Sequence, residues 1–147
     1  MNEKIPIRAV VSFGSNISPR RKYLQQALEA VANFPLTRLI MVSEAEETDP
    51  VGVPEEFSHM KFLNQLAIFE TALSAQEFSD LMHKAEDRLG RVRSVRNGPR
   101  TADIDLIDFG GEVICTPELT LPHPRAHERE FVMKPWNELK KRLSELK

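Results

Sequence analysis

Cysteine is scarce in this chain of 147 residues, and long apolar runs are missing. The one cysteine, Cys115, excludes a disulfide within the chain and a cysteine-rich zinc site. No segment approaches the roughly 18 apolar residues of a membrane helix, and residues 1–7 lack the apolar stretch of a signal peptide. The formal net charge of -2 argues against a globally basic nucleic-acid binder. These absences predict a cytoplasmic enzyme or binding module with neither membrane nor nucleic-acid partners.

The remaining composition is typical of one globular domain, which we expect to span residues 1–147. Hydrophobic residues make up 41% and charged residues 29%, so a sizeable core can form. Strands are predicted at 8–13, 36–43, 62–70 and 101–109, and helices are predicted to begin at 18, 74 and 135. The order β-α-β-β-α-β predicts an α+β fold of the ferredoxin-like kind, an antiparallel sheet flanked by helices in an αβα sandwich.

The predicted helices carry clear start signals. Ser18 followed by Pro19 predicts that Ser18 caps the first helix and that the proline occupies its first turn. Ser74 and Glu77 have the spacing of a capping box at the start of the second helix. The apolar faces are expected at Leu24, Ala27, Leu28 and Val31 in the first helix and at Phe78, Leu81, Met82, Ala85 and Leu89 in the second, which Gly90 is placed to end.

The segments between these elements hold turn residues. Gly110-Gly111 predicts a hairpin, with residues 113–114 as its short return strand. Residues 44–61 and 117–129 contain several prolines and are expected to be irregular. A loop of about 15 residues is more often functional than idle, so residues 44–61 are a candidate binding segment.

Two aspartates in the last predicted strand give the sharpest chemical signal. Because side chains alternate along a strand, Asp103 and Asp105 share one face. Paired carboxylates repel each other unless a cation lies between them, and Mg²⁺ prefers such ligands together with substrate phosphates. From the pattern alone, a magnesium site and two solvated aspartates remain equal alternatives. Asp108 breaks the alternation and is expected to face away from the pair, as a solvated or a turn-capping residue, so it is left out of the metal site. The residues expected on the opposite face, toward the helices, are Ala102, Ile104 and Leu106.

An arginine-rich stretch precedes this strand. Within thirteen residues that contain no acid lie Arg88, Arg91, Arg93, Arg96 and Arg100. The guanidinium fork suits phosphate oxygens, and transfer of a phosphoryl group depends mainly on charge neutralisation and positioning. A solvated basic face or an RNA contact remains the alternative interpretation. No P-loop and no protein-kinase glycine loop occurs in the sequence, so side chains and metals would have to hold a nucleotide.

Seven ordered motifs run from Ala9 to Pro135. They are Phe13-Gly14-Ser15-Asn16, Glu47-Thr48-Asp49-Pro50-Val51-Gly52, Phe62-Leu63-Asn64, Glu86 with Leu89-Gly90-Arg91-Val92-Arg93, Gly98-Pro99-Arg100-Thr101-Ala102-Asp103-Ile104-Asp105, Leu121-Pro122-His123-Pro124 and Arg129-Glu130-Phe131-Val132. With these motifs the chain resembles the 6-hydroxymethyl-7,8-dihydropterin pyrophosphokinase family. The resemblance implies an enzyme of folate synthesis that transfers pyrophosphate from magnesium-ATP to the hydroxymethyl group of a dihydropterin and releases AMP.

The resemblance also implies roles for individual residues. The implied magnesium ligands, for two ions, are Asp103 and Asp105, and the implied catalytic residues are this pair with Arg91 and Arg100. The implied pterin-binding residues are Thr48, Val51, Phe62, Asn64 and Phe131. The implied ATP-binding residues are Glu86, Arg91, Arg93, Arg100, Leu106, Thr120, His123 and Arg129. We expect a monomer that acts on these two small molecules.

Two departures from the family pattern keep other functions open. Glu118 stands where some members carry an ATP-contacting arginine. The arginine loop between Arg93 and Arg100 is about one residue shorter than in some relatives, and Asn97 stands in it where a tryptophan can occur. A non-catalytic pterin- or nucleotide-binding module on the same fold is therefore an alternative. A third hypothesis, an RNA- or anion-binding protein, lacks the aromatic platforms expected beside the arginines.

Overall fold

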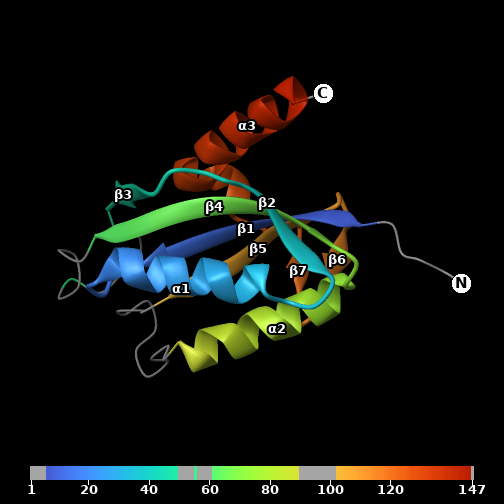
Figure 1. Cartoon of the computed structure of the whole chain (residues 1–147), viewed down its shortest axis with the longest axis horizontal. Coiled ribbons are helices and arrows are strands. Elements are labelled where there is room, and N and C mark those ends of the chain that lie inside the picture. Colours follow the sequence, from blue (N-terminus) through green and yellow to red (C-terminus); the bar gives the residue numbers. More distant parts are fainter. Residues whose placement is uncertain (1–5, 50–54, 56–60, 90–101, 147) are drawn as a thin grey trace, which may run out of the picture.

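The computed structural model describes residues 6–49, 55, 61–89 and 102–146. An antiparallel five-stranded sheet lies between helices on both of its faces (Figure 1). The elements in chain order are β1 (Ile7–Ser15), α1 (Arg20–Ala32), β2 (Thr37–Val42), β3 (Glu46–Thr48), β4 (Phe62–Thr71), α2 (Ala75–Arg88), β5 (Asp103–Phe109), β6 (Ile114–Cys115), β7 (Thr120–Leu121), the 3-10 helix η2 (Ala126–Glu128) and α3 (Glu130–Glu145).

The sheet has the strand order β2-β4-β1-β5, and β3 also pairs with β4. All of these pairs are antiparallel. Helix α1 connects β1 to β2, and α2 connects β4 to β5, which is the β-α-β-β-α-β arrangement predicted from the sequence. The ferredoxin-like α+β fold is therefore confirmed.

Two apolar clusters hold the three layers together. Helices α1 and α2 cover one face of the sheet, and α3 crosses the other (Figure 1). The first cluster contains the fully buried rings of Phe13, Phe69, Phe78 and Phe109, and burying one such side chain contributes roughly 1.5–3 kcal/mol. The second cluster, under α3, contains Val10, Leu66, Ile68, Ile107, Ala126, Val132 and Leu139. None of the helices in the described residues combines the length and the apolar character that a membrane crossing requires.

The two helix starts differ from each other. The capping box of α2 is confirmed, because Ser74 Oγ accepts from the Glu77 amide at 3.1 Å and Glu77 Oε1 accepts from the Ser74 amide at 2.9 Å. The prediction that Ser18 caps α1 is wrong, because Pro19 occupies the cap position and no side chain there accepts a hydrogen bond. Gly90, expected to end α2, lies outside the described residues, and the helix ends at Arg88.

Three segments differ from the sequence expectation. Residues 44–61 were expected to be irregular, but Glu46–Thr48 form β3 because β4 offers them a free edge. Gly110 and Gly111 make the expected turn, with φ of 59° and 77°, but β6 pairs with β7 instead of returning along β5. Residues 117–129 contain β7 and η2.

Helix α3 begins at Glu130, five residues before the predicted start at Pro135. Pro135 therefore lies inside the helix, where it cannot donate to the carbonyl of Phe131. The helix continues through it because Val132, Pro135 and Leu139 form a buried stripe against the sheet.

Candidate functional site

The strand register brings predicted pterin-binding and metal-binding residues next to each other on one face of the sheet. Here a row means the residues that lie opposite one another across adjacent strands. Gly14 of β1 lies opposite Asn64 of β4 on one side and opposite Asp103 of β5 on the other. One row further along, Ser12 lies opposite Asp105. Residues that lie opposite each other share a face, and the alternation places this face under α3.

The carboxylate pair, Asp103 and Asp105, projects from β5 as the alternation predicted. Both aspartates are half-buried, while Ala102, Ile104 and Leu106 belong to the core on the α1 and α2 side. Asp108 lies beyond a shift in the β1–β5 register, and its carboxylate accepts from the Gly111 amide at 3.3 Å. Of the two alternatives expected for Asp108, a solvated or a turn-capping residue, the structure shows the turn-capping one.

A buried acid supports β5 from the opposite face. Glu86 of α2 is 1% exposed, and its Oε2 accepts from the backbone amide of Ile104 at 2.8 Å. Ile104 separates the two aspartates, so this hydrogen bond holds the strand where the carboxylate pair projects from it. The sequence carried a signal for this role, because Glu86 falls at helical spacing between Met82 and Leu89 on the apolar stripe of α2.

Cationic side chains lie beside the carboxylate pair. Arg129 Nη1 is 4.0 Å from Asp105 Oδ2, and the Arg129 guanidinium carbon is 5.7 Å from the centre of the Phe131 ring. The pKa of His123 is lowered, first by burial and then by Arg129 and Arg125, while the charge of Asp103 acts in the opposite direction. The imidazole Nδ1 accepts from the Arg125 amide at 3.2 Å. His123 and Arg129 are thus placed where an anion next to the carboxylate pair would meet donors.

The predicted pterin residues contact one another from two strands. Thr48 of β3 lies opposite Phe62 of β4, and the Asn64 side-chain amide donates to the Thr48 hydroxyl. Phe62 and Phe131 are both half-buried. In the described part of the chain, the ring-to-ring contacts join Phe13, Phe34, Phe69, Phe78 and Phe109, a set that includes neither of them. Their rings therefore stand apart from the aromatic core, on the side that α3 only partly covers.

Gly14 is a site residue for which the sequence motif gave no role. A Cβ at this position would lie 3.1 Å from Asn64 Oδ1 and 3.6 Å from Phe62 Cδ1. The absence of a side chain therefore lets the Asn64 amide and the Phe62 ring lie close to the backbone of β1. The glycine is thus required for close approach and not for its backbone conformation.

Other predicted residues are not brought together with this group. Leu106 is 5% exposed and packs in the core on the α1 and α2 side, and Thr120 is exposed on β7. The nucleotide contacts implied for these two residues and for Glu86 stay predictions. The predicted residues Val51, Arg91, Arg93 and Arg100 lie outside the described part of the chain.

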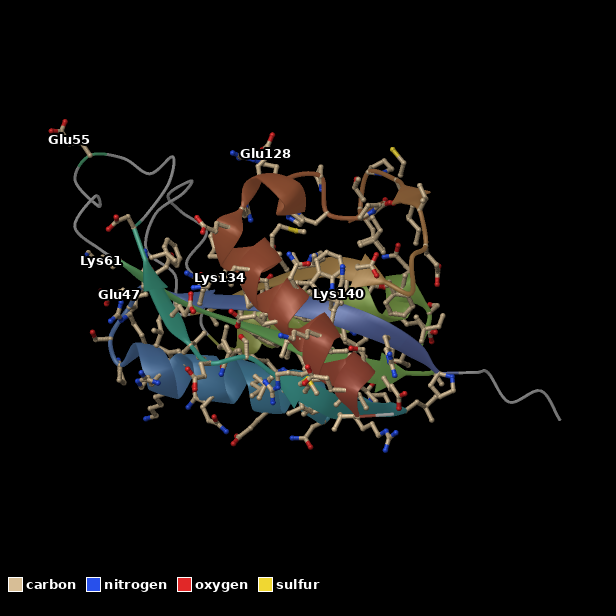
Figure 2. All side chains as sticks on the ribbon, turned by 90° about the horizontal axis from the view of Figure 1, so that it is seen from above. Glu47, Glu55, Lys61, Glu128, Lys134 and Lys140 are labelled. Atoms are coloured by element: carbon tan, nitrogen blue, oxygen red, sulfur yellow. The ribbon has the colours of Figure 1, made fainter. Side chains whose placement is uncertain are left out.

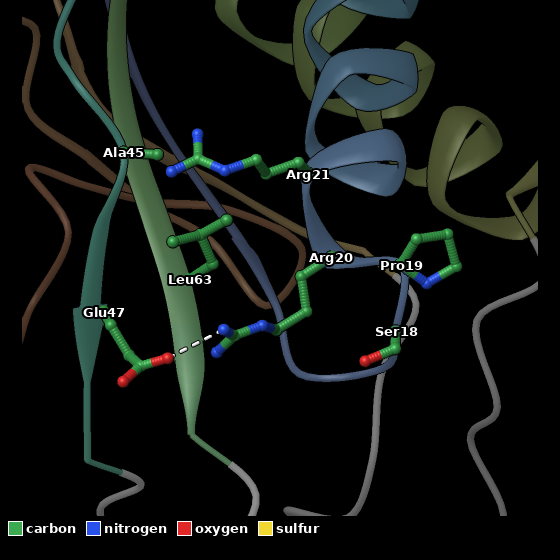
Figure 3. A pocket seen from close by; sticks show the side chains of 7 residues that line it. All are labelled: Ser18, Pro19, Arg20, Arg21, Ala45, Glu47 and Leu63. Atoms are coloured by element: carbon green, nitrogen blue, oxygen red, sulfur yellow. Dashed lines mark hydrogen bonds and ion pairs between the residues drawn. The ribbon is translucent and has the colours of Figure 1, made fainter.

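A cavity of about 590 Å³ lies next to the start of α1 (Figure 3). It is on the α1 side of β4, whereas Asn64 and the carboxylate pair lie on the α3 side. It is lined by Ser18, Pro19, Arg20, Arg21, Ala45, Glu47 and Leu63. Leu63 belongs to the cluster on the α1 and α2 side, so the cavity does not open onto Asn64 or the carboxylate pair. Of its three charged side chains, Arg20 and Glu47 are paired with each other at 2.7 Å, and Arg21 is the third.

The donor set of the carboxylate pair fits magnesium. Across the described residues, no three or more His, Cys, Asp or Glu side chains gather closely enough to hold a metal ion by themselves. Two neighbouring carboxylates on one face supply hard oxygen ligands and leave the other positions to water and phosphate oxygens, which is how Mg²⁺ is commonly bound.

Comparisons with known proteins show which family and which fold the chain is similar to. The profile of the 7,8-dihydro-6-hydroxymethylpterin-pyrophosphokinase (HPPK) family matches residues 10–141. The chain is 41% identical over 131 residues to the 2-amino-4-hydroxy-6-hydroxymethyldihydropteridine pyrophosphokinase of Bacillus subtilis (strain 168), covering 89% of this chain and 77% of that protein. It is 36% identical over 132 residues to the protein of the same name from Pseudomonas aeruginosa, covering 90% and 80%. A crystal structure of an HPPK-DHPS in complex with substrates has a similar fold, with a TM-score of 0.67 and 12% identity over 91% of this chain and 40% of that one.

Proposed function

The chain belongs to the 7,8-dihydro-6-hydroxymethylpterin-pyrophosphokinase family, and we therefore propose that it transfers pyrophosphate from ATP to the hydroxymethyl group of 6-hydroxymethyl-7,8-dihydropterin. The observation that carries the proposal is the position of Gly14, opposite both Asn64 and Asp103. The ring-binding residues and the carboxylate pair are thereby adjacent, as transfer between a bound ring and a bound polyphosphate requires.

The pterin ring is placed between Phe62 and Phe131. A flat heteroaromatic ring favours two aromatic faces and a few fixed polar groups at its edge. The amide of Asn64, held by the Thr48 hydroxyl, offers a donor and an acceptor to that edge. The implied contact of Val51 completes this set in the proposal.

The polyphosphate of ATP is placed beside the carboxylate pair. Asp103 and Asp105 hold magnesium, two ions in this proposal, which supplies charge neutralisation at the phosphates. Arg129 and His123 donate to phosphate oxygens, and the implied roles of Arg91 and Arg100 add further positive charge. The pterin hydroxymethyl oxygen bonds to the β-phosphorus and gives its proton to solvent. The bond from the β-phosphorus to the oxygen that it shares with the α-phosphorus breaks, and AMP leaves with that oxygen.

One assay tests the reaction. The protein is incubated with ATP, magnesium and 6-hydroxymethyl-7,8-dihydropterin, and the nucleotide products are separated. Stoichiometric AMP and pterin diphosphate are expected, whereas ADP would indicate transfer of a single phosphoryl group. Absence of AMP together with intact pterin binding would support the non-catalytic binding module instead.

The proposal includes three further properties of the protein. It is a monomer, it has one domain, and it is located in the cytoplasm with its nucleotide substrate. The exposed large apolar side chains of the described residues, Leu36, Leu39, Val113 and Leu146, are spread over β2, the Gly110 turn and the end of α3. Scattered apolar residues of this kind are ordinary on a monomer. Light scattering with size-exclusion chromatography measures the mass directly.

A further inference from the structure

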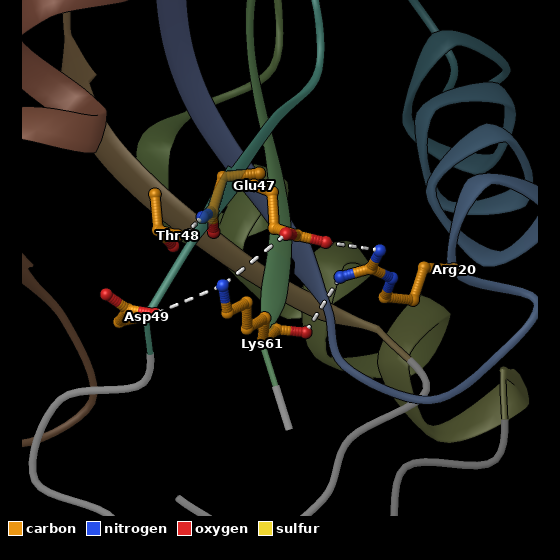
Figure 4. Close-up of polar contacts among 6 residues, drawn as sticks. Arg20, Glu47, Thr48, Asp49 and Lys61 are labelled. Atoms are coloured by element: carbon orange, nitrogen blue, oxygen red, sulfur yellow. Dashed lines mark hydrogen bonds and ion pairs between the residues drawn. The ribbon is translucent and has the colours of Figure 1, made fainter. Parts of the chain in front are cut away.

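Arg20, the first residue of α1, joins two chain segments that flank the candidate pterin site (Figure 4). Its Nη2 donates to Glu47 Oε2 at 2.7 Å, and its Nη1 donates to the backbone carbonyl of Lys61 at 3.0 Å. Glu47 lies in β3 and Lys61 directly precedes β4, so one planar guanidinium spans both segments. Lys61 Nζ adds longer ion pairs, 3.9 Å to Glu47 and 3.8 Å to Asp49.

The residues next to these contacts are the predicted ring-binding residues. Glu47 lies opposite Leu63 in the register, and the next pair along is Thr48 opposite Phe62. Because neighbours on a strand point to opposite faces, Arg20 holds β3 and β4 from the α1 side, while Thr48 and Phe62 face the α3 side. The backbone that Arg20 ties together is therefore the backbone that sets the spacing of Thr48 and Phe62.

Strand β3 has little intrinsic stability of its own. It has three residues, it pairs only with β4 among the described strands, and two of its residues are glutamates, which are depleted in strands. Its glutamates are held from both faces of the sheet. Glu47 pairs with Arg20 of α1, and Glu46 lies 3.7 Å from Lys134 of α3, the helix that crosses the sheet in Figure 2.

We propose that Arg20 is a positioning residue for the pterin, which by joining Glu47 to Lys61 fixes β3 against the start of β4. The inference rests on the proposed placement of the pterin. An ion pair that is partly exposed to solvent contributes little to folding stability. We therefore expect loss of the Arg20–Glu47 pair to change substrate binding more than folding stability. The hydrogen bond from Arg20 also holds the pKa of Glu47 below its usual range.

Steady-state kinetics of matched variants test the role. The variants are Arg20→Gln, Glu47→Gln, their double mutant and Arg38→Gln, and the last removes the pair between Arg38 and Glu70, 2.6 Å apart on β2 and β4. Each single change in the Arg20–Glu47 pair should raise KM for the dihydropterin about tenfold, equivalent to about 1.4 kcal/mol. KM for ATP and kcat should stay within about twofold of the values of the unmodified protein. The double mutant should have no higher KM for the dihydropterin than either single mutant, as expected for two residues that act as one unit. Arg38→Gln should leave all three constants unchanged.

An unchanged pterin KM in Arg20→Gln, an equal rise in Arg38→Gln, or additive effects in the double mutant would each overturn the positioning role. Should Arg20→Gln fail to fold, Glu47→Gln carries the same test, because the Glu47 side chain is 47% exposed. Asn64→Ala separates the two proposals. If it leaves the pterin KM unchanged, the placement of the pterin is wrong; if it raises KM while Arg20→Gln does not, only the positioning role is wrong.

Discussion

The carboxylate of Glu86 accepts a hydrogen bond from the backbone amide of Ile104, with 2.8 Å between Oε2 and the nitrogen. Glu86 is 1% exposed, and Ile104 is 3% exposed on the same side of the sheet. Helix α2 thereby holds β5 between Asp103 and Asp105, whose side chains leave the strand on the other face. A buried acid on the opposite face of the sheet can thus control where both carboxylates lie.

Replacing Glu86 should separate its acceptor role from its charge. Glu86→Ala leaves the Ile104 amide without this acceptor, at a cost of about 1–3 kcal/mol in the free energy of unfolding. Loss of the contact should also raise the magnesium concentration needed for half-maximal activity. Glu86→Gln keeps an acceptor oxygen at the same position. It should therefore lower the free energy of unfolding and raise the magnesium requirement much less than Glu86→Ala. Urea unfolding and magnesium titration of turnover measure the two effects.

Glu86→Gln also tests the implied contact with the nucleoside. If that contact depends on the negative charge, KM for ATP should rise in Glu86→Gln although stability is kept. If Glu86 acts only through Ile104, KM for ATP should stay near that of the unmodified protein. If Glu86→Ala and Glu86→Gln change the free energy of unfolding and the magnesium requirement equally, the acceptor role of Glu86 is wrong.

The carboxylate pair should be essential for turnover but not for folding. Asp103→Asn and Asp105→Asn keep side-chain size while removing a charge, so each should lower kcat by about 100-fold or more, the scale of losing one electrostatic contact in a transition state. Stability should be unchanged or slightly raised, because the repulsion between the carboxylates is relieved. Asp108→Asn is the matched control, since the Asp108 carboxylate accepts from the Gly111 amide in the turn and Asn keeps an acceptor oxygen there. Full activity of either metal-site variant at ordinary magnesium would refute the assignment.

Much of this site was predictable from the sequence because it depends on local rules. The period of two along residues 103–105 placed both aspartates on one face before any strand pairing was known. The cap of α2 followed from Ser74 and Glu77 alone. The α+β order followed from the alternation of helical and extended periodicity.

The remaining features depend on partners that lie far away in sequence. Strand β3 forms on the edge of β4 although Glu46 and Glu47 look like loop residues. Strand β6 pairs with β7 because a two-glycine turn sets the direction of the chain but does not choose its partner. Pro135 carries the local signal of a helix start, but the burial of Val132 extends α3 back past it. In each of these cases tertiary contacts outweigh the local signal.

Gly14→Ala should weaken pterin binding without straining the backbone. The added Cβ would lie 3.1 Å from Asn64 Oδ1, closer than an ordinary contact, so the Asn64 amide has to shift. KM for the dihydropterin should rise about tenfold, equivalent to about 1.4 kcal/mol, while KM for ATP stays unchanged. Gly111→Ala is the informative contrast, because Gly111 has a φ of 77° and open space around it. That change should lower stability by about 1 kcal/mol and leave both KM values unchanged.

The lowered pKa of His123 predicts a specific pH dependence of stability. Burial is the main cause and the charges of Arg129 and Arg125 add to it, so the folded protein favours the neutral imidazole. The unfolded chain takes up a proton near pH 6.5, before the folded protein does. The stability that His123 contributes is therefore fully present above about pH 6.5 and is lost as the pH falls through the lowered folded pKa. His123→Gln should flatten the decline of unfolding free energy in that acidic window, measured by urea titration at a series of pH values.

Nucleotide binding should reverse the shift if His123 faces the phosphates. A polyphosphate beside the imidazole favours the protonated form, so the pKa of His123 should rise when a non-hydrolysable ATP analogue binds. NMR titration of the His123 ring, assigned by its absence in His123→Gln and recorded in EDTA, follows this directly. Proton uptake on binding, seen as buffer-dependent heat in calorimetry, gives an independent measure. If the imidazole titrates at the same pH with and without the analogue, His123 does not belong to the phosphate site. The predicted dependence of stability on pH would still hold, because it follows from the surroundings of His123 in the protein without nucleotide.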